Sequence, residues 1–159
     1  MPFWKKSPPP APPTPERDAM GRYPAWYDAM EGRTEALAAA LAAGTPVDHA
    51  DKKRMTMLSV AAHYGQTDAV RLLIAHGADP NIIDSSGNGA LWHATREASK
   101  KTLDGDKPFD KQVVALLLAA GADPRHANPA GTTPPGWAQW SEELQAMYRA
   151  AGYDGEFAL

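Results

Sequence analysis

The sequence predicts an all-α solenoid of about four helix-turn-helix repeats joined by short β-hairpin-like connections. The first observation is a fixed interval, since Asp18, Asp51 and Asp84 lie 33 residues apart, as do Gly44 and Gly77. The second is that each unit carries two amphipathic stretches that are too short to be stable alone. A period of this size, made of individually weak helices, is typical of stacked repeats in which neighbours supply the missing contacts.

The interval divides the 159-residue chain into an arm and four units. We expect residues 1–17 to form a proline-rich flexible arm and residues 18–159 to form one repeat domain. The units are expected at about 18–50, 51–83, 84–127 and 128–159, and the last of them acts as a cap. The third interval, from Asp84 to Asn128, is 44 residues, which predicts an insertion at 98–108 between the two helices of that unit.

The expected helices of the second unit cover residues 58–64 and 68–76. Gly77, and Gly121 in the third unit, follow the second helices, where a left-handed backbone angle closes a helix at little steric cost. Thr67 and Asp68, or Asp110 in the third unit, are expected to open the same helices near their positive ends.

The expected core combines small and large apolar side chains. Ala61, Ala62 and Ala94 allow neighbouring helices to approach closely, and burial of each large aliphatic side chain is worth about 1.5 to 3 kcal/mol. The side chains expected to fill the space between helices are Leu72, Leu73, Leu116 and Leu117, and the aromatic side chains expected to pack in the core or at its edge are Trp26, Trp92 and Trp137.

The second unit reads DKKRMTMLSVAAHYG at 51–65 and DAVRLLIAHGADPN at 68–81, and the third repeats VVALLLAAGADP at 113–124. This repeated sequence resembles the ankyrin repeat, whose pattern runs roughly D-x-x-G-x-T-P-L-H-x-A-A-x-x-G and then E-V-V-x-L-L-L-x-x-G-A-D-x-N. The first and fourth units keep less of it, through Gly21 and Gly32 and through Gly131 and Thr133. The resemblance implies a helical repeat protein that binds another protein.

In the ankyrin family the concave face is made by the hairpin tips and the exposed side of each first helix. Transferred to this chain, the resemblance implies a partner-binding set rich in Tyr, Trp, Met and Arg, the types enriched at interfaces. The set is Arg22, Met30, Glu31, Lys52, Lys53, Met55, His63, Tyr64, Ser85, Ser86, Asn88, Arg96, Glu97, Thr132 and Trp140. For Met30 and Trp140 the alternative is that they seal the ends of the stack.

No catalytic motif is found in the sequence. The five histidines are dispersed, His49 and His126 occupy the same slot before a new unit, and His93 fits a satisfied core imidazole. Neither a phosphate-binding G-x-x-x-x-G-K-[ST] loop nor a G-x-S-x-G elbow occurs, so we expect no enzyme. Asp104, Asp106 and Asp110 loosely resemble a cation loop, but the downstream Glu is missing and Asp110 is expected to open the next helix. We therefore predict no metal and no cofactor.

Composition limits the partners and the compartment. A formal net charge of −3 and a pI near 5.9 argue against a nucleic-acid partner. The absence of cysteine and of any long apolar run favours a soluble cytoplasmic protein without a membrane partner, and we expect a monomer when free.

Two segments lie outside the repeated sequence, and each has two interpretations. The arm holds seven prolines within residues 1–15 and contains P-x-x-P text, so it is either a docking peptide or a solvated leader. Phe3 and Trp4 pack either on the first unit or on a partner. The insertion is either a recognition loop or a tolerated one, since loop closure adds only about 0.6 kcal/mol per doubling of length.

Three functional classes follow for a non-enzymatic protein-binding chain. The first is a stoichiometric inhibitor, because occluding one target requires one surface; immunity proteins against toxins in the same repeat family are an example. The second is a scaffold that also uses the arm, and the third is an accessory factor of an enzyme. The partner is therefore expected to be another protein, such as a toxin or an enzyme.

Overall fold

The computed structural model describes residues 15–100 and 108–158. Most of the expected arm, including Phe3 and Trp4, lies outside these residues, and so does the middle of the insertion with Asp104 and Asp106. The first residues of the insertion, Ala98 and Ser99, belong to a helix.

The described residues form eight helical elements. In chain order they are α1 (Pro24–Glu31), α2 (Thr34–Ala42), α3 (Met57–His63), α4 (Thr67–Ala75), α5 (Ala90–Ser99), α6 (Gln112–Ala119), the 3-10 helix η1 (Pro134–Ala138) and α7 (Glu142–Ala150). The β structure within the described ranges is limited to two isolated antiparallel bridges, Ala50 with Thr56 and Ile83 with Gly89. The all-α solenoid with hairpin-like connections is confirmed.

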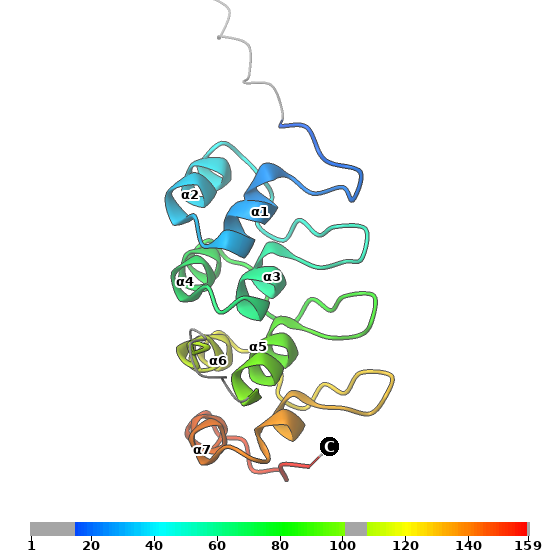
Figure 1. Cartoon of the computed structure of the whole chain (residues 1–159), viewed down its shortest axis with the longest axis vertical. Coiled ribbons are helices and arrows are strands. Elements are labelled where there is room, and N and C mark those ends of the chain that lie inside the picture. The colour runs from blue at the N-terminus through cyan, green and yellow to red at the C-terminus, as the bar shows by residue number, and fades with distance from the viewer. Residues whose placement is uncertain (1–14, 101–107, 159) are drawn as a thin grey trace, which may run out of the picture.

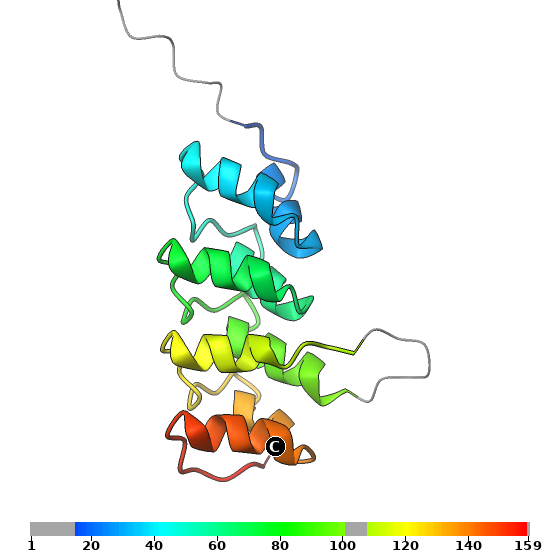
Figure 2. The ribbon, with the colours of Figure 1, turned by 90° about the vertical axis from the view of Figure 1, so that its left-hand side faces the viewer.

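The helices form two parallel columns (Figure 1). The first helices α1, α3 and α5, continued by η1, contact one another in that order, and the second helices α2, α4, α6 and α7 do the same. The loops that precede the first helices project to the side opposite the second helices, as fingers of similar length (Figure 1). Figure 2, which views the second helices face on, shows the four units succeeding one another along one axis.

Short polar contacts and glycines set the helix ends. The Thr56 hydroxyl accepts a hydrogen bond from the Ser59 N–H at 3.0 Å and caps α3. Gly77 and Gly121 have φ angles of 82° and 87°, which confirms the predicted left-handed closure after α4 and α6.

Thr67 and Asp68 open α4 as predicted, but Thr67 does not act through a side-chain cap. Gln66 occupies the N-cap position without a side-chain cap, and the Thr67 hydroxyl instead donates to Asp110 Oδ2 at 2.5 Å in the next unit. Asp110 does serve the start of α6, because its Oδ1 accepts the Gln112 N–H at 2.9 Å. A threonine at the first helical turn can therefore stabilise the stack rather than its own helix.

Alanines and leucines form the core, as expected. Ala61, Ala62 and Ala94 are completely buried, which allows α3 to pack between α1 and α5. Leu73 and Leu117 are also completely buried, whereas Leu72 and Leu116 lie at the edge of the core and are partly exposed. Trp26 is buried, and Trp92 and Trp137 are half-buried against each other with ring centroids 5.7 Å apart.

The fourth unit packs against the third. Its first helix is the short 3-10 turn η1, which begins with Pro134 and Pro135 and continues with Gly136, a poor helix former. The Tyr148 hydroxyl on α7 hydrogen-bonds Thr95 on α5 at 2.6 Å, and both residues are fully buried. Burial raises the pKa of Tyr148, so the phenol stays neutral and joins the fourth unit to the third.

Candidate functional site

One Asp or Asn side chain organises each hairpin tip. Its Oδ1 accepts the backbone N–H groups two and four residues later, at 2.8 to 3.1 Å, as an extended Asx turn. Adjacent tips are joined by backbone bonds from Lys52 N–H to Met20 O (2.9 Å) and from Ser85 N–H to Lys53 O (2.8 Å). The organising residues are Asp18, Asp51, Asp84 and Asn128.

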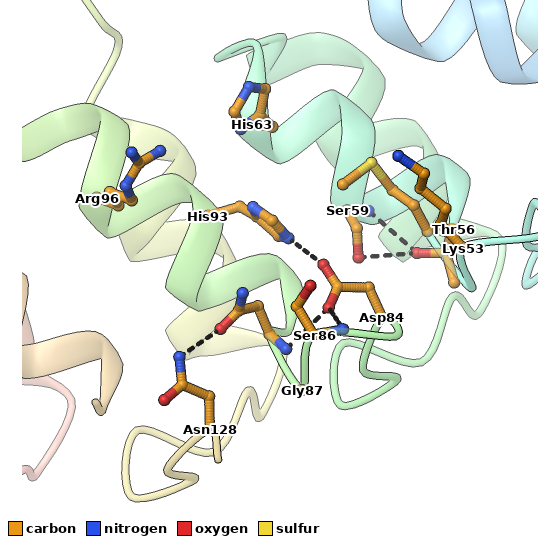
Figure 3. A network of polar contacts seen from close by, with 12 residues as sticks. Lys53, Thr56, Ser59, His63, Asp84, Ser86, Gly87, His93, Arg96 and Asn128 are labelled. Carbon is orange, nitrogen blue, oxygen red and sulfur yellow. Dashed lines mark hydrogen bonds and ion pairs between the residues drawn. The ribbon is translucent and has the colours of Figure 1, made fainter. Parts of the chain in front are cut away.

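The second side-chain oxygen ties the tip to a first helix or its neighbour. Asp51 Oδ2 accepts Arg22 Nε and Nη2 at 3.1 and 3.0 Å. Asp84 Oδ2 lies 2.9 Å from His93 Nε2, and both residues are buried (Figure 3). Burial lowers the pKa of His93 against the opposing effect of Asp84. His93 is thus the satisfied core imidazole that the sequence predicts.

Asn88 is not on the surface where the partner-binding set placed it. It is only 8% exposed, its N–H donates to Asp84 Oδ1, and its Oδ1 accepts Asn128 Nδ2 at 2.9 Å. Its side chain therefore contacts Asn128 of the next hairpin rather than solvent. Its visible role is to join the third and fourth tips.

The ends of the first helices carry the exposed aromatics. Tyr64 and Trp140, at 55% and 73% exposure, are the exposed large hydrophobic side chains of the described residues. Tyr64 follows α3 directly, and its ring packs edge-on against His63 at 5.0 Å between centroids. Trp140 occupies the corresponding end of the fourth unit, two residues after η1.

Charged and imidazole groups lie beside these aromatics. His63 Nδ1 is 3.8 Å from Glu97 Oε1, and the rings of His63 and His93 are 5.6 Å apart. Burial lowers the pKa of His63 in spite of Glu97. Arg96 pairs with Glu97 at 3.0 Å and lies 5.7 Å from the Trp92 ring centroid, which holds its guanidinium over an aromatic face.

A groove of about 740 Å³ runs between the second and third units, at the turn from first to second helix. His63, Tyr64 and Glu97 line one part of it, and Phe109 lines another. The Phe109 ring lies against Gly65, where a Cβ would meet the ring at 3.0 Å. Phe109 is not among the residues predicted from the sequence, although an aromatic directly after a polar insertion is a signal for an anchored loop end.

The structure gathers the rest of the partner-binding set on the tips and first helices, with unequal exposure. The exposed members are Glu31, Lys52, Lys53, Tyr64, Ser85, Ser86 and Trp140. The half-buried members are Arg22, Met30, Met55, His63, Arg96, Glu97 and Thr132.

The family model "Ankyrin repeats (3 copies)" matches residues 25–124, so the chain belongs to the ankyrin-repeat family. Ankyrin repeats are generally a non-enzymatic module of protein–protein interaction. A putative ankyrin repeat-containing protein of Treponema pallidum is 33% identical over 124 residues, which are 77% of this chain and 38% of that protein. Cyclin-dependent kinase 4 inhibitor B of Rattus norvegicus is 37% identical over 78 residues, which are 49% of this chain and 51% of that protein.

An ankyrin repeat domain from Acinetobacter baumannii AYE, known from a crystal structure, has the same fold. It aligns with 86% of this chain and 67% of its own at a TM-score of 0.74 and 30% identity. The chain spans well under two thirds of the length of the first curated relatives it matches.

Within 15–100 and 108–158, no group of three or more His, Asp or Glu side chains is arranged to hold a metal ion. In the same residues no helix has the length and apolar character needed to cross a bilayer. The unit boundaries, the partner-binding residues and the cytoplasmic location stay predictions.

Proposed function

We propose that this chain is a non-enzymatic inhibitor that covers a surface of one protein partner stoichiometrically, with its hairpin tips and first helices in contact. The observation that carries the proposal is the contrast among the large aromatics. Tyr64 and Trp140 are exposed at the ends of first helices, whereas Trp26 and Tyr148 are buried in the stack. Exposed Tyr and Trp are favoured anchors of protein interfaces.

Two observations support the inhibitor class: the chain presents one continuous surface, and one of its relatives is named as an inhibitor. Occlusion of a target needs one continuous rigid surface, which the bonded tips and stacked helices provide. The relative from Rattus norvegicus is, by its name, an inhibitor of a protein kinase. That similarity favours inhibition as the mode of action, and it identifies no kinase as the partner of this chain.

Site-specific photo-crosslinking in the native cells tests which surface is used. A benzophenone amino acid at position 64 should give one discrete adduct with the partner. The same amino acid at the exposed position 71 on α4, in the column away from the tips, is the matched control and should give none (Figure 1). Adducts of equal yield at both positions would show that the proposed face is not the binding face.

Once crosslinking has identified the partner, calorimetry and activity titration with the purified partner test whether the chain acts as an inhibitor. Tyr64→Ala should weaken the complex by about 2 kcal/mol or more if the tyrosine is an anchor, and Lys53→Glu should also weaken it. Arg71→Ala is the control and should change the affinity little. The activity of the partner should fall to its minimum at one equivalent of this chain, and a partner that stays fully active in the saturated complex contradicts the inhibitor class.

A further inference from the structure

We infer that the partner presents an acidic protein segment to the hairpin tip formed by Lys52, Lys53 and Arg54, here called the cationic tip. The inference rests on the proposed function and specifies the chemistry of the partner surface.

The cationic tip carries charges that the fold itself does not use. All three side chains are exposed, and within the described part of the chain they make no hydrogen bond, ion pair or ring contact. Each of the other described lysines and arginines contacts a carboxylate, an amide, a carbonyl or an aromatic ring. In Figure 3 Lys53 has no dashed line to any neighbour.

Nearby acids do not neutralise these charges. Asp51, at the start of the same tip, is buried; its Oδ1 accepts two backbone N–H groups and its Oδ2 accepts Arg22. The neighbouring tip in the third unit reads Ser85-Ser86-Gly87 and is uncharged. The tip is therefore a local positive site on a chain whose net charge is −3.

The backbone presents the cationic tip rigidly. Hydrogen bonds join it to the first tip through Lys52 N–H and to the third through Lys53 O, so the ammonium groups extend from a fixed base. Arg54 has φ 61°, a left-handed angle, at the position that Gly21 and Gly87 fill in other units. An arginine there costs conformational free energy that a glycine would avoid, which fits a side chain retained for contact with a partner.

Charge complementarity selects an acidic protein segment as the occupant. Three adjacent cations can pair with clustered Asp or Glu side chains, and they also speed the encounter with such a segment. A nucleic acid fits less well, because its phosphate backbone is extended and requires a basic surface of similar length. The net negative charge of the chain also repels a nucleic acid.

The fold supplies a matched variant for the test. Lys52→Ser, Lys53→Ser and Arg54→Gly together give the second unit the tip sequence Ser-Ser-Gly, which the third unit already carries in the folded protein. This triple variant is called the transplant. Circular dichroism should show this transplant folded. The control loses the same three charges elsewhere, through Arg33→Ser, Arg71→Ser and Arg125→Ser, which are exposed positions outside the tips.

Fluorescence anisotropy then compares three labelled probes at low and at physiological ionic strength: a glutamate-glycine peptide, a lysine-glycine peptide of the same length, and an oligothymidylate. We expect the full chain to bind the glutamate peptide in a salt-dependent way. The transplant should bind it about tenfold more weakly, because three exposed ion pairs each contribute modestly, and the control variant should bind nearly as the parent does.

Three results would overturn the inference. These are equal binding by the parent and the transplant, tighter binding of the lysine peptide, and tighter binding of the oligothymidylate. Crosslinking at position 64 separates this failure from failure of the proposed function, because a discrete adduct there would preserve the binding face even if the glutamate peptide does not bind. Absence of both the adduct and peptide binding would remove both proposals.

Discussion

Replacement of Asp84 by alanine should destabilise the fold far more than a surface substitution does. The side chain accepts Ser86 N–H at 2.8 Å, Asn88 N–H at 3.1 Å and His93 Nε2 at 2.9 Å, and it is buried. Hydrogen bonds to a charged group contribute about 1.5 to 3 kcal/mol each, and removal of the buried carboxylate recovers part of this as relieved desolvation. We expect Asp84→Ala to lower the free energy of unfolding by about 3 kcal/mol.

Asp84→Asn is the matched comparison. Asn128 fills the same position in the fourth unit, where its Oδ1 accepts Ala130 and Thr132 N–H groups at 3.0 Å. An asparagine at 84 should keep the equivalent backbone bonds and cost about 1 kcal/mol. Urea unfolding of both variants near neutral pH, followed by circular dichroism, measures the difference. Equal losses for the two variants would refute the view that the backbone bonds of the tip dominate.

Two further predictions concern backbone strain and pH. Arg54→Gly should raise the free energy of unfolding by about 1 kcal/mol, because glycine adopts the left-handed angle of 61° without steric cost; a lower urea midpoint would contradict this. Burial lowers the pKa of His93 in the folded state, so as the pH falls the unfolded chain takes up the proton first. Stability should therefore be level above about pH 6.5 and decline below it, until the pH passes the lowered pKa. His93→Gln should reduce that decline in urea midpoints measured between about pH 7.5 and about pH 5.5, while His63, whose pKa burial also lowers, retains its share. An unchanged slope would count against His93 as a cause.

Positions whose role recurs from unit to unit were predicted well from the sequence. Gly77 needs a left-handed angle whatever surrounds it, so its place after a helix was sufficient to assign its role. His49 and His126 were recognised as structural from their shared slot, and their Nε2 atoms lie 2.7 and 3.0 Å from the carbonyl oxygens of Gly21 and Gly87. A periodic sequence predicts such contacts because each unit repeats the geometry of the previous one.

Positions whose partners lie in another unit were predicted less well. Thr67 has a sequence context suited to capping, but its hydroxyl finds Asp110, 43 residues away. Asn88 stands beside exposed serines in the text and is nevertheless covered by Asn128 of the next tip. Phe109 lies outside the period, so no equivalent residue indicated that its ring packs on Gly65.

The sequence by itself determined the architecture, because a 33-residue interval, helix-closing glycines and short amphipathic stretches leave stacked helical hairpins as the arrangement that buries their apolar faces. The tertiary structure alone decided which polar side chains are buried and hydrogen-bonded within the stack and which remain exposed. Asp84 bonds Asn88 and His93 within the third unit and Asn88 bonds Asn128 of the fourth, whereas the cationic tip and Tyr64 stay exposed. The physical reason is that pairing and burial depend on distances between units, and these distances follow from packing rather than from local sequence.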